Sequence, residues 1–144
     1  MSDDEATARL KIISSKRTPE MITDVVGLNS DRSWRVGDKR PHTIIEEKNY
    51  GWVIDSGLLK TNSMEQHVRA LLERVAPYKN AIKQLSRDDS VEFSCVLYTH
   101  ETPALNFNAS TIDQIGQLGA SLDIDLYLRD GISSAAPRDS ERLG

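Results

Sequence analysis

Two aspartates one residue apart, Asp123 and Asp125, lie in the apolar run LGASLDIDLYL and are the first side chains to consider for chemistry. Residues i and i+2 of a strand are about 7 Å apart, and glycosidases can hold their two carboxyl groups at such a separation. A catalytic pair also needs one carboxyl group in a desolvated site that raises its pKa. Ser121 and Tyr127 share the face of the expected strand with the aspartates, so we predict a solvent-facing pair. A metal or catalytic role and a contact with a partner are the less favoured alternatives.

The histidines and the cysteine supply no second reactive group. No two of the three histidines have the spacing of a metal site. Cys95 falls on the expected inward face of a strand, where burial disfavours the thiolate. The sequence has no glycine-rich phosphate loop and no G-x-S-x-G elbow. We therefore predict no catalytic residue, no metal and no cofactor. A hydrolase that uses Asp123 with His100 or Glu101 is the least favoured alternative.

The most unusual stretch is DRSWRVGDKRPH, where basic side chains surround an indole in a chain that is acidic elsewhere. Guanidinium groups beside an indole can anchor a carboxylate-rich or anionic partner. We predict that the binding residues are Arg32, Trp34, Arg35, Asp38 and Trp52. The alternative is a solvated loop in which Arg35 stacks on Trp34 and Asp38 pairs with a neighbour. A concave pocket formed by both tryptophans and Arg35 would instead favour a small-molecule or anion site.

Composition limits the classes of partner. The chain has 144 residues and a formal net charge of −4, and an acidic domain repels phosphate backbones, so we expect no nucleic-acid partner. No apolar run approaches the about 18 residues that span a membrane, and the polar N-terminus lacks the pattern of a secretory signal. A single cysteine allows no internal disulfide. We expect a cytoplasmic protein with no membrane association.

Hydrophobic spacing and capping residues predict the elements that must position these side chains. Thr18 followed by Pro19 favours a helix start, as does the Ser63–Gln66 capping box, and Pro77 predicts a break in the second helix. In the last strand we expect even-numbered residues, Leu122 to Leu128, to face the core. We expect strands at 6–14, 43–46, 52–55, 90–98, 104–108 and 120–128, and helices at 18–28, 62–86 and 110–119.

This order of elements predicts an α+β fold. We expect a single, largely antiparallel sheet with helices packed on one face, in a loosely ferredoxin-like arrangement. A chain of this length fits one domain, which we place at 6–130. Residues 1–5 are expected to be disordered, and residues 131–144 to form a flexible tail, because they contain few apolar groups.

Several blocks of the sequence together resemble one family. TPEMITDVVGLNSDRSWRVGD, YGWVIDSG, HVRALLERVAP, FSCVLY and LGASLDIDLYL occur in this order. Over roughly residues 7–128 the chain resembles the bacterial family catalogued as domain of unknown function 4279. The resemblance implies a compact bacterial α+β domain in the cytosol, and it supplies no catalytic residue to transfer.

The sequence favours a non-enzymatic protein-binding module, of the immunity type or a regulatory type. This expectation depends on the lack of a catalytic constellation and on the arginine- and tryptophan-containing loop. The immunity role is an analogy with other small acidic bacterial α+β proteins. A small-molecule or anion-binding domain is the alternative, and homo-oligomerisation stays open.

Overall fold

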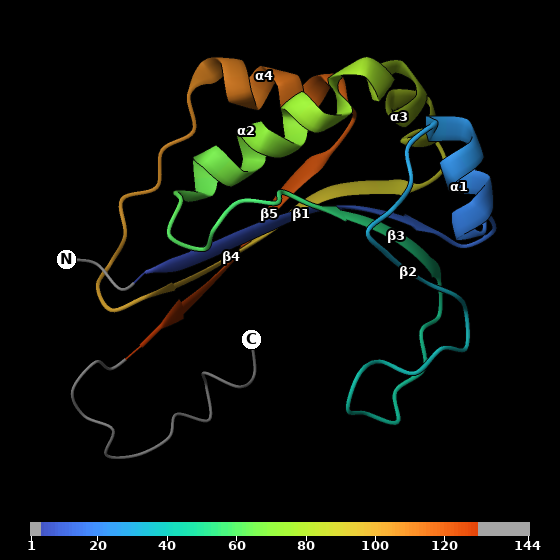
Figure 1. Cartoon of the computed structure of the whole chain (residues 1–144), viewed down its shortest axis with the longest axis horizontal. Helices are drawn as coiled ribbons and strands as arrows, with labels where there is room; N and C mark the ends of the chain where they lie inside the picture. Colours follow the sequence, from blue (N-terminus) through green and yellow to red (C-terminus); the bar gives the residue numbers. More distant parts are fainter. Residues whose placement is uncertain (1–3, 130–144) are drawn as a thin grey trace.

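A computed structural model of the chain describes residues 4–129. A five-stranded sheet has the order β2-β3-β1-β4-β5, and Figure 1 shows the helices packed over one of its faces. Its strands are β1 (Glu5–Ser14), β2 (Arg32–Trp34), β3 (Tyr50–Asp55), β4 (Ser90–Thr99) and β5 (Ser121–Leu128). The helices are α1 (Pro19–Val26), α2 (Met64–Val75), α3 (Lys79–Leu85) and α4 (Ala109–Gln117), and a 3-10 turn at Ala76–Tyr78 joins α2 to α3.

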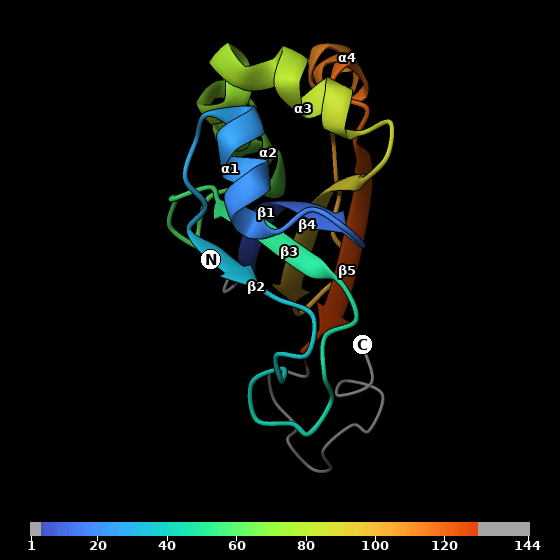
Figure 2. The ribbon, with the colours of Figure 1, turned by 90° about the vertical axis from the view of Figure 1, so that its right-hand side faces the viewer.

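The first four strands form the predicted ferredoxin-like unit. β1 pairs antiparallel with both β3 and β4, and β2 pairs antiparallel with β3. β5 is an addition to this unit. It runs parallel to β4 and therefore needs the crossover that α4 provides. β2 and β5 consequently lie at opposite edges of the sheet (Figure 2). The expected α+β class and the single, mostly antiparallel sheet are confirmed.

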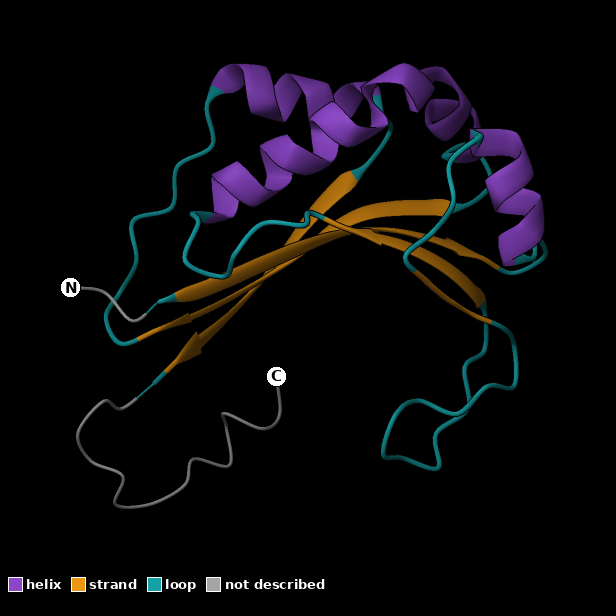
Figure 3. Cartoon of the chain, viewed as in Figure 1, coloured by secondary structure: helices purple, strands orange, loops and turns teal. Residues whose placement is uncertain are grey.

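The two faces of the sheet differ in what covers them. Figure 3 shows all helices of the described chain on one side of the strands, and the other side carries no helix. The strict alternation of buried and half-buried residues in β1 places Ala6, Ala8, Leu10 and Ile12 under the helices. The core continues into α2 and α3, whose apolar stripe includes Leu71 and other fully buried side chains. We call the other side of the sheet the helix-free face.

The helix termini follow the predicted chemistry. The Thr18 side chain accepts a hydrogen bond from the Met21 amide, and Gly27 ends α1 in the left-handed conformation. Ser63 and Gln66 form the reciprocal capping box of α2. The long helix is interrupted where Pro77 occurs, because proline has no amide hydrogen to donate.

The predicted hairpin partner of β3 is wrong. Thr43–Glu46 is not a strand, and β3 pairs instead with Arg32–Trp34, so that Ser33 lies opposite Trp52 and Trp34 opposite Gly51. A single bridge between Lys39 and Glu46 is the remnant of the expected pairing. The sizes of Ser33 and Gly51 explain why β3 pairs with Arg32–Trp34, because each of these small residues leaves room for the tryptophan opposite it on the neighbouring strand.

One further expectation about local structure is wrong. Residues 104–108 form a connection without strand pairing, and its end is held at α2, where the Asn108 amide donates to the Glu65 carboxylate at 2.8 Å. The helix expected at 110–119 is α4, which Asn108 caps and which buries Thr111 and Ile115 while Ile112 is exposed.

The alternation in β5 holds only in its first half. Leu122 and Ile124 pack against the core, whereas Leu126 and Leu128 are exposed. The physical reason is position, because the end of β5 is an edge that extends past the helices (Figure 2). Of residues 1–5, which were expected to be disordered, 1–3 lie outside the described residues, as does the expected tail at 131–144, and β1 already begins at Glu5.

Candidate functional site

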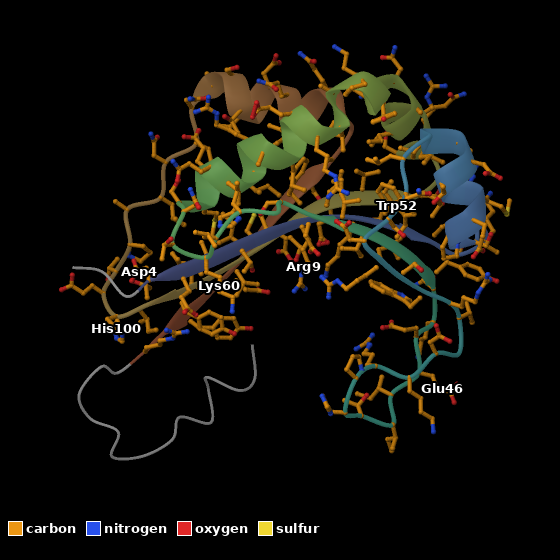
Figure 4. The ribbon with its side chains drawn as sticks, viewed as in Figure 1. Asp4, Arg9, Glu46, Trp52, Lys60 and His100 are labelled. Atoms are coloured by element: carbon orange, nitrogen blue, oxygen red, sulfur yellow. The ribbon has the colours of Figure 1, made fainter. Side chains whose placement is uncertain are left out.

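Trp52 belongs to the core. Its side chain is 0% exposed, and the indole Nε1 donates to the Thr23 hydroxyl of α1 at 3.0 Å. Figure 4 shows the side chain on the helix side of β3. A buried indole needs such a polar partner, and this bond ties α1 to the sheet. Trp52 is therefore positioned to stabilise the fold.

Trp34 lies on the opposite side of the sheet. It is half-buried and covers Gly51 so closely that a Cβ atom at Gly51 would overlap with the indole ring. Cross-strand partners lie on the same face of a sheet, so Trp34 shares the helix-free face with Gly51, while Trp52 and Ser33 share the other. The structure does not bring the two tryptophans together into a pocket.

Arg32 takes part in a cluster on the helix-free face. Its guanidinium group lies 3.2 Å from Asp55 Oδ1, and the guanidinium of Arg9 lies 3.3 Å from the same oxygen. Figure 4 shows Arg9 pointing to this side of the sheet. All three side chains are substantially exposed, so the pairs contribute little to stability, but one carboxylate already neutralises part of the predicted basic site.

An ion pair that the sequence did not reveal holds the residue that precedes β2. Asp31 accepts two hydrogen bonds from Arg74 of α2, at 2.7 and 3.2 Å, and one from the Asp55 amide at 2.8 Å. The hydrogen bond from Arg74 is the main cause that lowers the pKa of Asp31; desolvation opposes it, and the Asp55 amide and the charges of Arg74 and Arg32 add smaller lowering effects. Residues 31 and 74 are far apart in sequence, so no local pattern signals their pairing.

Arg35 and Asp38 form the base of a projecting segment. The Asp38 carboxylate accepts from the Arg35 amide at 2.8 Å, and the Arg35 guanidinium lies 2.6 Å from Glu20 of α1. The pKa of Glu20 is lowered first by its own backbone amide at the helix start and also by Arg35. Asp38 does pair with a neighbour, as the solvated-loop alternative expected, whereas Arg35 pairs with Glu20.

We name residues 35–49 the arm. It extends away from the sheet on the helix-free side (Figures 1 and 3). Its two halves are joined by backbone hydrogen bonds: Gly37 to Glu47 at 2.8 Å, Glu47 to Asp38 at 2.7 Å and Arg40 to Ile45 at 2.8 Å. The arm is therefore a hydrogen-bonded hairpin and not a random loop, and Glu46 lies on it in Figure 4.

The tip of the arm is apolar. Ile44 is 87% exposed and Ile45 is 51% exposed, and Val36 near the base is also exposed. Sequence reasoning placed Ile44 and Ile45 in a half-buried strand and so missed this surface. The signal was available in the flanking polar and turn-forming residues, which indicate a segment that leaves the sheet.

Asp123 and Asp125 are exposed on β5, and no ion pair to either appears within residues 4–129. On the neighbouring strand Cys95 is fully buried. Burial raises the pKa of its thiol to about 12, with smaller contributions from the charges of Asp123 and Glu92. The thiol is therefore neutral and inert near neutral pH.

His67 makes a contact that resembles catalytic chemistry. Its Nδ1 lies 2.6 Å from the Ser56 hydroxyl, and burial lowers the pKa of the imidazole. A serine nucleophile activated by histidine needs a third group that orients the ring. Here Nε2 is buried without a hydrogen-bond partner among the described residues. The pair instead fastens the segment after β3 to α2.

The other candidate reactive residues do not come together within the described part of the chain. His100 is exposed, and its Nδ1 contacts the Arg129 carbonyl at 3.1 Å. Within the described range, no group of three His, Cys, Asp or Glu side chains comes close enough to hold a metal ion. No helix between residues 4 and 129 has the length and apolar character to cross a membrane.

Two cavities lie away from the predicted binding residues. One of about 430 Å³ lies between the start of α2 and residues 103–105, and one of about 210 Å³ lies between the α2–α3 junction and α4. None of the five predicted residues lines either of them. The predicted residues therefore do not contribute to either of these two cavities.

Comparison with known proteins gives the family. No curated protein and no solved structure matches the chain. One family model matches residues 4–129, which confirms the resemblance inferred from the sequence blocks. The chain belongs to the family described as domain of unknown function DUF4279.

Proposed function

We propose that this protein is a non-enzymatic protein-binding module that contacts its partner through the arm. We further propose a bacterial cytoplasmic setting and an immunity-type or regulatory role, in which the partner is a protein held in a stable complex. The single observation that supports the proposal most is the apolar tip of a hydrogen-bonded arm, where Ile44 is 87% exposed.

The apolar side chains at the tip are ordered and exposed to water in the isolated protein. Each isoleucine at the tip costs solvation free energy in the isolated protein, and burying a side chain of this kind in an interface returns about 1.5–3 kcal/mol. The backbone bonds across the arm and the Arg40–Glu47 pair at 3.4 Å hold the tip in place. A preorganised tip loses little conformational entropy on binding, which favours affinity.

Two of the predicted residues, Arg35 and Asp38, lie at the base of the arm, and Lys39 follows them on the segment that leads to the tip. They add charges of both signs beside the apolar residues, and we propose that they form a polar rim, which contributes specificity and association rate more than affinity. The alternative of a small-molecule or anion site has less support. Arg32 and Arg35 each already pair with a carboxylate, and Trp52 lies in the core.

The test is a comparison of tagged variants in a native host. We expect wild-type protein to capture one protein in a stoichiometric complex after crosslinking, and the double substitution Ile44→Asp and Ile45→Asp to lose it. With purified partner, the substitutions should raise Kd by at least tenfold, because two buried apolar contacts are removed.

The matched control is Leu59→Asp. Leu59 is 76% exposed but lies between β3 and α2, outside the arm. It should leave capture and Kd unchanged. Loss of binding in both variants, or no stoichiometric partner at all, would contradict the proposal.

A further inference from the structure

The two edges of the sheet are built differently. β2 is an edge strand of three residues, and the chain leaves it directly for the arm. β5 is an edge strand of eight residues that pairs with β4 alone in the described chain. Figure 2 shows its outer edge without a neighbouring strand. Natural proteins usually shorten, bend or cover such edges, because outward N–H and C=O groups pair readily with another strand.

The side chains of this edge add an apolar surface. Leu126 is 48% exposed and Leu128 is 57% exposed, and both point to the helix side of the sheet, as do the half-buried Leu122 and Ile124. The strand contains no proline and no glycine that would oppose pairing. An edge strand that no other element of residues 4–129 covers and that exposes two leucines is suited to the addition of a strand.

We propose that a second copy of this chain occupies this edge, with its β5 antiparallel to the first. The two copies would be related by a two-fold axis at Leu126, so that Leu126 lies opposite itself. Ile124 then lies opposite Leu128 of the second copy, on the helix side. The two sheets join into one continuous ten-stranded sheet, and the two arms lie at its far ends.

Charge complementarity selects this register. With the axis at Leu126, Asp123 lies opposite Arg129 of the second copy, twice by symmetry, and opposite charges on facing strands stabilise a sheet. An axis at Ile124 would place Asp123 opposite Asp125, and an axis at Asp125 would place that residue opposite itself. Both registers bring like charges together, which is unfavourable.

A two-fold axis one residue further on, at Tyr127, also avoids the repulsion, but the resulting strand pairing is shorter. That pairing places Asp125 opposite Arg129 and includes only residues 125–129 of each copy, whereas the pairing around Leu126 includes residues 123–129. In the single chain Arg129 pairs with Glu5 at 3.0 Å and lies over the Tyr98 ring, so contact with Asp123 of the second copy requires its side chain, which is 37% exposed, to turn toward the edge. The longer register buries more of the exposed apolar surface and uses more backbone groups.

Crosslinking at Leu126→Cys tests the register in the full chain. Facing residues of antiparallel strands have Cβ atoms about 4.5–5.5 Å apart, close to the separation in a disulfide. We expect oxidation to link this variant into a covalent dimer. Ile44→Cys is the control for collision of exposed thiols, since Ile44 is more exposed and distant from β5, and oxidation should form no covalent dimer of this variant. The native Cys95 is buried and should not react.

Sedimentation of the unmodified protein at micromolar concentration supplies the second readout. We expect a dimer, converted to a folded monomer by Leu126→Lys, which places two like charges at the axis. Asp123→Arg should also weaken the dimer, and adding Arg129→Asp should restore it at least in part. A monomeric wild type, or a dimer that neither changes with Leu126→Lys nor crosslinks through Leu126→Cys, overturns the proposal. A monomer in which the Leu126→Cys thiol resists a thiol reagent also overturns it, because the same chain then covers the edge.

Discussion

The two tryptophans of neighbouring strands show how differently the two faces of one sheet are used. Trp52 and Trp34 lie one residue out of register on β3 and β2. Trp52 is enclosed by the core and bonded to α1, whereas Trp34 rests on a glycine at the surface of the helix-free face. The same residue type therefore stabilises the core on one face and forms part of the surface on the other. What decides its role is the strand parity, which sequence composition does not show.

The contrast extends to the charged groups. The strand residues that face the helices are uncharged, while the helix-free face carries Arg9, Arg32 and Asp55 in a partly exposed cluster. Substitutions on the two faces should therefore differ in the property they change. Core substitutions change the free energy of unfolding, and arm or edge substitutions change association.

The largest expected effect is the removal of the buried indole. Trp52→Ala should lower the free energy of unfolding by about 3–5 kcal/mol, because it leaves a cavity and an unpaired Thr23 hydroxyl. Trp34→Ala should cost markedly less, since its side chain is half-exposed. Urea denaturation of both variants measures the difference. Equal losses would mean that the two faces contribute alike to stability.

An intermediate effect is expected at the glycine under Trp34. Gly51→Ala should cost about 1–3 kcal/mol, because the new methyl group and the indole cannot occupy the same space. In a Trp34→Ala background the same substitution should cost almost nothing. Gly116→Ala is the control, as nothing lies near its added Cβ and alanine favours a helix by about 0.5–1 kcal/mol. Additive losses in the double variant would show that the two residues do not touch.

The smallest expected effect is a pH dependence from His67. Burial lowers the pKa of this imidazole in the folded state, so the unfolded chain binds a proton more readily. Stability should therefore be retained above the ordinary pKa of 6.5 and decrease as pH falls below it. Urea midpoints over this range measure the slope, which His67→Gln should reduce and His42→Gln, at an exposed histidine, should not. An unchanged slope in His67→Gln would assign the pH dependence to other groups.

Local patterns predicted most of the fold, and long-range pairing explains the rest. The caps at Thr18 and Ser63 and the break at Pro77 are local, so the sequence revealed them. The choice of Arg32–Trp34 over Thr43–Glu46 as the partner of β3 depends on how two tryptophans fit across strands. No spacing rule contains that information.

The candidate site was predictable in location but not in composition. The stretch around Trp34 and Arg35 does lead into the arm, yet Ile44 and Ile45 were expected in a strand. Two adjacent isoleucines can belong to a strand or to the tip of a hairpin, and the local sequence does not distinguish these two structures. Likewise, Leu126 and Leu128 continue a regular alternation, and only the sheet order reveals that no helix covers them.

The central place of β1 has a consequence for how the chain is made. Glu5–Ser14 leaves the ribosome before both of its neighbours, Tyr50–Asp55 and Ser90–Thr99, which follow much later. The strand therefore has no partner for its backbone groups, and no cover for its alternating apolar residues, until most of the domain has been synthesised. Such distant pairing slows folding and leaves an apolar strand open to wrong partners during translation.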